Sequence, residues 1–246
     1  MKCLRKVYLL AVVSMSMLLF SSCNKTSSTK EGDENDQKEI FYGKVVYTSV
    51  IEAGDTLLEN TLSSLSPEKV EVYFGQNKFR LIEYGGLSKG NVIIYLDQKE
   101  VWQLDTAKKL AWLGEYSDFS TSSPELQDIL PDHYAPTVES TGINETVAGI
   151  ECIKYKIIRS GIIPASDEAH IWVAENIHFP PSRFDIQTEI NYITVPAPLL
   201  IGYTGGAIMR LHVKGKSYER TIEVASIEKN NLPAGIFDIP SDYQKK

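Results

Sequence analysis

No apolar run in this sequence is long enough to cross a membrane. The longest extends from Val7 to Phe20 and follows a short basic segment. At about 14 residues it falls short of the roughly 20 that a helix needs to span a hydrocarbon core. A basic start followed by an apolar run of this length is typical of a secretory signal peptide, which is removed from the mature protein.

The apolar run ends in two serines that are followed directly by Cys23. This pattern resembles the bacterial lipobox, although Phe20 replaces the usual aliphatic residue. The resemblance implies that residues 1–22 are a lipoprotein signal peptide and that a lipid on Cys23 anchors the mature chain; two or more acyl chains hold a protein on a bilayer stably. Asn24, in place of the aspartate of inner-membrane lipoproteins, favours the outer membrane of a Gram-negative envelope. The alternative is an ordinary signal peptide with an incidental cysteine.

Cysteine is scarce, with three in the whole chain. Cys3 lies in the signal peptide and Cys23 is the lipid attachment site, so Cys152 remains alone. The mature chain therefore has no pair for an internal disulfide and no Cys-x-x-Cys motif for zinc or redox chemistry. An exported domain of about 200 residues without a disulfide relies on its hydrophobic core. Cys152 has no neighbouring histidine, so we expect a half-buried thiol in a strand and not a nucleophile.

Basic residues are too few for a protein that binds nucleic acid. The chain has 25 basic and 32 acidic side chains, a net charge of −7, and loss of Lys2, Arg5 and Lys6 with the signal peptide lowers the net charge to −10. An acidic domain cannot gain from the release of counterions that drives binding to nucleic acids. We therefore exclude a nucleic-acid partner.

Sequence motifs of catalysis are incomplete or missing. Gly215-Lys216-Ser217 is similar to the end of a phosphate-binding loop, but Arg210 stands where that loop has its first glycine, so a hairpin turn is predicted. Residues 66–69 have the Ser-x-x-Lys spacing of penicillin-recognising enzymes without the other motifs of those enzymes. His170 and His178 do not have the spacing of a compact metal chelate. The sequence predicts no catalytic residue, no metal site and no cofactor.

A polar segment from Asn24 to Glu39 contains no apolar residue. This composition predicts a disordered tether, and about 16 flexible residues have an end-to-end distance of about 20 to 24 Å. The folded part is expected to begin at Ile40, and no later linker divides it. The expected organisation is a signal peptide over residues 1–22, a lipidated cysteine and tether over 23–39, and a single domain over 40–246.

From Ile40 onward apolar and polar residues mostly alternate with a period of two, and β-branched and aromatic residues dominate, which predicts β-strands. The expected strands are 41–51, 70–74, 78–84, 92–96, 101–104, 110–113, 138–140, 150–158, 170–174, 184–193, 207–213 and 218–227. Two short helices are expected, over residues 56–65 and 124–130. The fold class is α+β, mainly β, with one antiparallel sheet whose apolar face the helices cover.

The layout of four short motifs resembles uncharacterised lipoproteins of the LolA/LolB-like superfamily. The motifs are Glu145–Gly149, Glu151–Lys156, Ile171–Val173 and Phe237–Tyr243. The resemblance covers residues 40–243 and implies a single curved antiparallel sheet, a half-barrel, wrapped over two or so short helices. It also implies an apolar interior, which accepts acyl chains in the carrier members. Because a lipid on Cys23 makes the protein stationary, a membrane-side acceptor or sensor is favoured over a soluble shuttle.

Two groups of apolar residues are candidates for ligand binding. Five strand aromatics are expected to line a cavity: Phe74, Phe79, Trp102, Trp112 and Trp172. The alternative is that these aromatics are ordinary core, which is the commoner case. The loop from Val195 to Gly206 is apolar although loops usually meet water, which suggests a membrane-dipping tip, a partner contact or a lid at Pro198, Leu199, Leu200 and Ile201. A short helix that caps the sheet would explain the same loop.

Three functions are compatible with the sequence. The first is a membrane-anchored protein that binds an acyl chain, lipid or other apolar ligand in the sheet cavity, at about 0.8 kcal/mol for each CH₂ enclosed. The second is an interaction or structural protein of the envelope with a packed core and no ligand. The third is a hydrolase whose site assembles from distant residues, for which no motif argues.

Replacement of the lipid attachment site tests the predicted anchor. Because acylation requires the Cys23 thiol, we expect Cys23→Ser to incorporate no labelled palmitate in the native strain, whereas the wild type becomes labelled. Cys152→Ser is the matched control and should be labelled like the wild type. An unlabelled wild type, or a labelled Cys23→Ser variant, would contradict the anchor.

Overall fold

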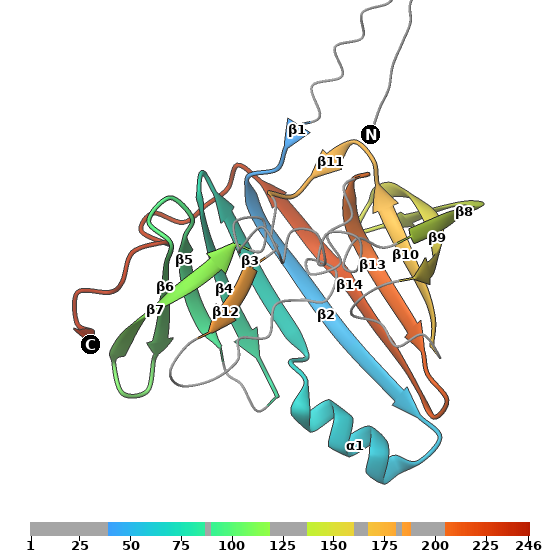
Figure 1. Cartoon of the computed structure of the whole chain (residues 1–246), viewed down its shortest axis with the longest axis horizontal. Coiled ribbons are helices and arrows are strands. Elements are labelled where there is room, and N and C mark those ends of the chain that lie inside the picture. The colour runs from blue at the N-terminus through green and yellow to red at the C-terminus, as the bar shows by residue number, and fades with distance from the viewer. Residues whose placement is uncertain (1–38, 87–89, 119–136, 160–166, 181–183, 188–204) are drawn as a thin grey trace, which may run out of the picture. The chain divides into compact units, whose positions relative to one another are not determined.

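The computed structural model describes residues 39–86, 90–118, 137–159, 167–180, 184–187 and 205–246. All elements named below belong to one structural unit that spans residues 37–246. In Figure 1 they form a continuous series of strands, with β7 and β12 towards one end, β2 near the middle and β8 at the other end. The predicted mainly β fold is confirmed, and the described residues contain one helix.

Most strands belong to one long, open sheet. They are β2 (Gly43–Ala53), β3 (Lys69–Gly75), β4 (Lys78–Tyr84), β5 (Asn91–Tyr95), β6 (Glu100–Asp105), β7 (Leu110–Asp118), β8 (Thr137–Val147), β9 (Ile150–Arg159), β10 (Glu168–Ala174), β12 (Phe184–Gln187), β13 (Ala207–Lys214), β14 (Tyr218–Lys229) and β15 (Gln244–Lys245). Their order is β12-β7-β6-β5-β4-β3-β2-β14-β13-β10-β9-β8. β15 pairs with β7 in parallel, and the other pairs of this sheet are antiparallel. A separate parallel pair joins β1 (Glu39–Ile40) and β11 (Ile177–His178).

Strand β2 lies near the centre because it has a partner on both edges. On one edge β3 pairs with residues 43–48, and on the other β14 pairs with residues 43–53. β3 follows β2 closely in the sequence, whereas β14 comes from near the end of the chain. The strands β2 to β7 pair in sequence order and are here called the meander. Through its pairing with β14, β2 connects the meander to the strands β14, β13, β10, β9 and β8.

The main apolar core lies on one face of the meander. Val72, Leu81 and Val92 are buried neighbours on β3, β4 and β5, because the antiparallel register places them side by side. They belong to a large cluster of buried residues, here named the main cluster, that also includes Tyr47 of β2 and Trp172 of β10. β-Branched and aromatic side chains pack well on a pleated surface of this kind, which explains their frequency in the predicted strands.

The residues that follow β14, 230–246, are here named the C-terminal segment, and they cover the opposite face of the meander, here named the outer face. Phe237 is 7% exposed and packs in a cluster with residues of β3, β5, β6 and β7. Arg80 donates to the backbone carbonyl of Ile236 (2.7 Å), and the Tyr95 hydroxyl donates to that of Phe237 (2.5 Å). A Cβ atom on Gly75 would lie 2.8 Å from the Phe237 ring, so this contact requires a glycine. The closing motif that was noted in the sequence thus has a structural role.

The predicted helix over residues 56–65 is present as α1 (Thr56–Leu65). The Asp55 carboxylate caps it by accepting a hydrogen bond from the N–H of Leu58 (2.9 Å). The expectation that this helix covers the apolar face is wrong, because α1 follows the end of β2 at the rim of the sheet (Figure 1) and none of its residues is buried.

The second expected helix, over residues 124–130, lies outside the described residues. Within the ranges that the structure describes, no helix combines the length and the apolar character needed to cross a membrane.

Removal of the Phe237 ring tests the role of the C-terminal segment. We expect Phe237→Ala to lower the free energy of unfolding by about 3 to 5 kcal/mol, because it leaves a cavity between the segment and the sheet. Urea unfolding followed by tryptophan fluorescence measures the change. Asp242→Asn is the control in the same segment: it removes an exposed ion pair with Lys109 and should have little effect. Equal stability of both variants would contradict the packing role.

Candidate functional site

Three of the five candidate aromatics lie in the main cluster. Phe74, Phe79 and Trp172 are buried there. The Phe74 ring meets that of Phe79 edge-on, with centroids 5.4 Å apart, and stacks on that of Phe179 at 5.1 Å. Rings that contact each other in this way contribute to the core whether or not a ligand binds beside them.

The other two candidate aromatics do not join this cluster. Trp102 packs with the cluster formed by the C-terminal segment on the outer face, and its indole N–H donates to Glu100 (2.9 Å). Trp112 is half-buried and lies opposite Gln103 in the register of β6 and β7. The structure therefore groups Phe74, Phe79 and Trp172 but separates Trp102 from them.

Buried polar atoms without a hydrogen bond distinguish the main cluster. Within the described part of the chain no partner is found for the Tyr47 hydroxyl, the Trp172 indole N–H or Nε2 of His178. Tyr47 and Trp172 belong to the main cluster, and Ile177 and Phe179, which flank His178, pack against it. Burial raises the pKa of Tyr47, so its hydroxyl keeps the proton and can donate it. Because buried polar groups in native proteins are nearly always paired, these atoms are candidate ligand contacts.

Trp172 also lies between two cations. Nζ of Lys154 is 4.8 Å from the ring centroid, and the guanidinium carbon of Arg210 is 5.0 Å from it. Arg210 is held in turn by Glu223 (2.7 Å) and Glu145 (3.1 Å). Cation–π contacts contribute about 0.5 to 2 kcal/mol each, so residues of neighbouring strands cooperate to fix the position of this indole.

Cys152 and His170 lie in strands, and burial shifts the pKa of each. Burial raises the pKa of the Cys152 thiol to about 11, so little of the reactive thiolate exists at neutral pH. Burial lowers the pKa of His170, whose Nε2 lies 3.9 Å from a carboxylate oxygen of Glu168. Among the described residues no three histidine, cysteine or acidic side chains are grouped so that they would hold a metal ion.

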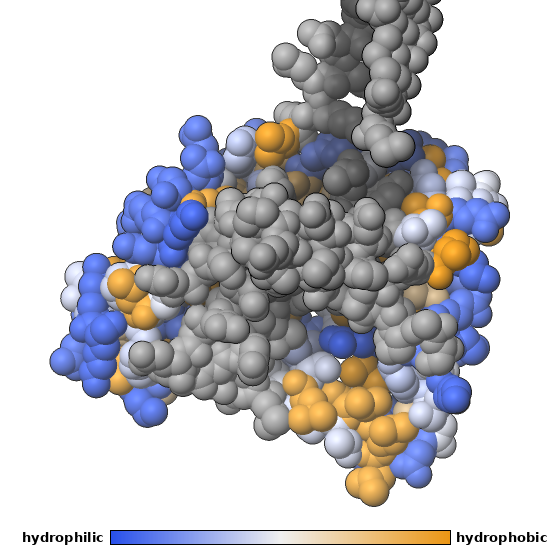
Figure 2. Space-filling view, viewed as in Figure 1, coloured by the Kyte–Doolittle hydropathy of each residue, from blue (hydrophilic) through white to orange (hydrophobic). Residues whose placement is uncertain are grey.

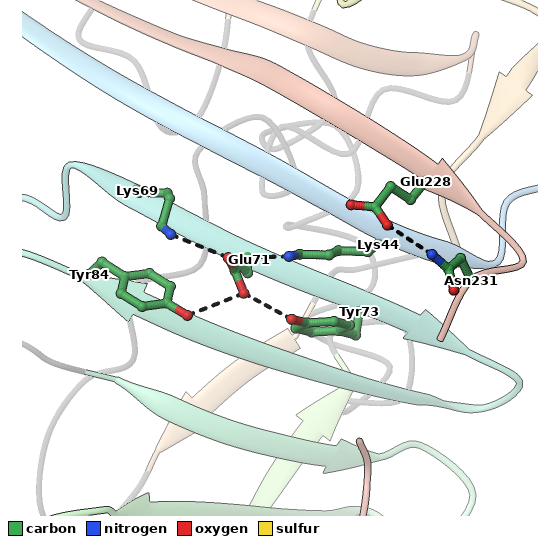
Figure 3. Close-up of polar contacts among 7 residues, drawn as sticks. All are labelled: Lys44, Lys69, Glu71, Tyr73, Tyr84, Glu228 and Asn231. Atoms are coloured by element: carbon green, nitrogen blue, oxygen red, sulfur yellow. Dashed lines mark hydrogen bonds and ion pairs between the residues drawn. The ribbon is translucent and has the colours of Figure 1, made fainter. Parts of the chain in front are cut away.

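A buried carboxylate on the outer face was not predicted from the sequence. Glu71 of β3 is 9% exposed and lies at the centre of the polar contacts in Figure 3. Its oxygens accept hydrogen bonds from Tyr73 (2.8 Å), Tyr84 (3.2 Å) and Lys69 (3.3 Å) and form an ion pair with Lys44 (3.3 Å). Since side chains of the same chain already surround both oxygens, we interpret this cluster as structural.

The pKa of Glu71 reflects these contacts. Burial alone would raise it, but hydrogen bonds from Tyr73, Lys44 and Lys69 outweigh burial and lower the pKa below the ordinary value of 4.5. Burial and the hydrogen bond to Glu71 raise the pKa of Tyr73 to about 12. The cluster therefore holds a charged carboxylate and a neutral phenol at neutral pH.

Sequence reasoning missed both Tyr47 and Glu71. A signal existed for Glu71, because it lies between Val70 and Val72 in β3, and the alternation of side chains places it on the face opposite these valines. Its partners on β2 and β4 depend on the register between strands, which the local sequence does not specify. The predicted lid at residues 198–201 and the lipid site at Cys23 lie outside the described residues.

The sequence profile of one protein family, "Domain of unknown function (DUF4412)", matches residues 57–243. No curated protein matches the chain. Among solved structures, an uncharacterized conserved protein from Thermus thermophilus is similar with a TM-score of 0.45 and 11% sequence identity, over 87% of this chain and 93% of that chain.

Two further solved structures are similar at lower scores. PNGF-II matches with a TM-score of 0.41 and 8% identity, over 84% of this chain but only 31% of that one. A LolA superfamily protein from Nitrosomonas europaea matches with a TM-score of 0.31 and 12% identity, over 82% of this chain and 93% of that one. The neighbours thus include the superfamily that the sequence resembles. At these scores we infer neither an activity nor a ligand from them.

The structural role of Glu71 predicts a specific dependence on pH. Because its folded-state pKa is lowered, its contribution to stability is complete above the unfolded pKa and is lost as the pH falls through the folded pKa. We expect Glu71→Gln to lower the free energy of unfolding by about 1 to 3 kcal/mol at pH 7, and the difference from the wild type to shrink below the ordinary pKa of 4.5.

Urea unfolding at a series of pH values measures this difference. The control is Glu228→Gln, which removes an exposed carboxylate that accepts a hydrogen bond from Asn231 (3.1 Å), also drawn in Figure 3. A difference between the wild type and Glu71→Gln that stays constant from pH 7 to pH 3 would overturn the assignment.

Proposed function

This chain belongs to the DUF4412 family, a domain of unknown function, and we propose that it is a lipid-anchored envelope protein that binds an apolar ligand at the main cluster. The proposed ligand is an acyl chain, a lipid or a molecule of similar chemistry. The proposed activity is binding, which requires no catalytic residue and no cofactor.

The proposal is carried by the unpaired polar atoms of the main cluster. A polar group that is buried without a hydrogen bond costs about 1 to 3 kcal/mol. A ligand that presents an oxygen atom to Tyr47 or Trp172 would remove that cost, while its hydrocarbon part would be stabilised by about 0.8 kcal/mol per CH₂. Apolar walls with a few placed polar groups are the general composition of small-molecule sites.

The expected anchor supports a receptor fixed to a membrane. A lipid on Cys23 and a polar tether to Glu39 would hold the domain near the headgroups without fixing its orientation. Because Asn24 follows the cysteine, we place the protein at the outer membrane of a Gram-negative envelope. An apolar ligand at such a membrane would arrive from the bilayer or from a carrier protein.

The alternative is an envelope protein with a packed interior and no ligand. The contacts of Phe74 with three neighbouring phenylalanine rings favour it, because these side chains fill space against one another. In that case the function would lie at the surface of the protein.

Analysis of copurified lipid separates the two functions. The chain from Asn24 onward, expressed without its signal peptide and therefore without its own acyl anchor, is purified and extracted with organic solvent. We expect mass spectrometry of the extract to find fatty acid or phospholipid in stoichiometric amount. A domain that carries none, and that does not bind labelled palmitate when it is offered, would favour the packed interior.

A pair of tyrosine variants tests the proposed contact. Tyr47→Phe removes a hydroxyl with no partner in the described structure, so we expect stability to be kept and the Kd for labelled palmitate to rise roughly two- to tenfold. Tyr73→Phe is the control: its hydroxyl donates to Glu71 on the outer face, so stability should fall and Kd should not change. The reverse result would remove Tyr47 from the site.

A further inference from the structure

Helix α1 presents apolar side chains to solvent. It contains four leucines, at positions 57, 58, 62 and 65, and none of its residues is buried. Leu57 is 77% exposed and Leu65 is 50% exposed. In Figure 2 hydrophobic residues gather at the end of the view where Figure 1 draws α1. Isolated helices of about ten residues are marginal in water and usually gain stability by burying an apolar face. The exposed apolar side chains of α1 are therefore a candidate contact surface for another molecule.

An open pocket adjoins the start of α1. Its volume is about 580 Å³, and two stretches of the chain line it: residues 52–55, from the end of β2 towards α1, and residues 214–219, from the end of β13 to the start of β14. The second stretch contains the Gly215–Ser217 segment, which is the hairpin connection expected from the sequence. The apolar helix face and this pocket together form one surface, here named the α1 surface.

The α1 surface carries an unbalanced negative charge. Glu52 and Glu219 lie directly opposite each other on β2 and β14, an arrangement of like charges that is unfavourable. Glu219 is neutralised by Lys214 at 2.6 Å, whereas Glu52 has no ion pair within the described residues. With Asp55 and Glu59, the rim carries four carboxylates and two lysines. A basic side chain of another molecule would form an ion pair with Glu52 and offset its repulsion from Glu219.

These charges decide between the possible occupants. Helices that lie on membranes carry lysine or arginine on the polar face and aromatic residues on the apolar face, and α1 has none of these. A second copy of the chain would bring a second acidic rim against the first, and such contacts are repulsive. A different protein with an apolar groove and basic flanks fits both features.

The position of α1 also suits a protein partner. The chain enters the main sheet at Gly43, the start of β2, shortly after β1, and α1 follows the opposite end of β2 (Figure 1). At about 3.3 Å per residue, β2 separates the two by about 33 Å. The α1 surface is therefore remote from the point where the preceding segment joins the domain.

We infer that the α1 surface is a docking site for a protein that presents an apolar groove flanked by lysine or arginine. Leu57 and Leu65 enter the groove, as in other complexes in which a helix lies in an apolar groove, and a basic side chain meets Glu52. The inference does not rest on the proposed apolar ligand.

Photocrosslinking in the native strain tests the inference on the full chain. A benzoylphenylalanine residue replaces Leu57, and in a matched control it replaces Ile158, which is 55% exposed on β9. We expect one discrete protein adduct from position 57 and none from position 158. Addition of Glu52→Lys should lower the yield of the adduct about tenfold, because it reverses the charge that the basic flank would meet.

The crosslinked protein is then identified by mass spectrometry, purified and titrated against the wild-type chain. The inference holds if binding is direct, weakens with added salt and is lost with Leu57→Ser together with Leu65→Ser. Unchanged thermal melting of these surface variants keeps the comparison interpretable.

Several results would overturn the inference. These are an adduct with a second copy of the chain, a crosslink within the chain, an adduct with lipid alone, and the absence of any adduct at position 57. A protein adduct that forms equally from position 158, or that is indifferent to Glu52→Lys, would have the same consequence.

Discussion

The pairing of β2 with β14 is the contact on which the rest of the architecture depends. It joins residues 43–53 to residues 218–229 and so links the meander to the strands of the second half of the chain. Because β2 is paired along both edges, its register determines which of its side chains point to each face of the sheet. Tyr47 enters the main cluster, and Lys44 reaches Glu71 on the outer face. A shift by one residue would exchange these faces and lose both arrangements.

The two faces differ in how completely their polar groups are satisfied. On the outer face the carboxylate of Glu71 has four partners, and Arg80 and Tyr95 donate to the backbone of the C-terminal segment. In the main cluster Tyr47 and Trp172 have polar atoms with no partner among the described residues. A polar network in which every group is paired holds its side chains in one arrangement. Unpaired donors in an apolar setting are instead available to hydrogen-bond another molecule.

The local parts of this fold could be predicted from the sequence, and the long-range parts could not. The leucine spacing indicated the bounds of α1, and alternation indicated the β3–β4 hairpin, whose turn places Asn77 at a φ of 55°. Trp102 and Phe74 both lie in strands, but their faces follow from their register with neighbouring strands. The pairing of β2 with β14, and the exposure of a helix that looked suited to cover the core, depend on the whole chain.

A folded protein generally buries its apolar side chains and pairs its buried polar atoms. The exposed leucines of α1 depart from the first rule, and the unpaired atoms of the main cluster depart from the second. Such departures in natural proteins concentrate at functional sites. Both involve β2, since Tyr47 lies on this strand and α1 begins shortly after its end. A domain that holds an apolar ligand against Tyr47 and docks a partner through Leu57 would use β2 for the first contact and the helix that follows β2 for the second. Such an arrangement would place ligand and partner at separate positions near β2, as a membrane-fixed receptor would require if it had to hold one while it bound the other.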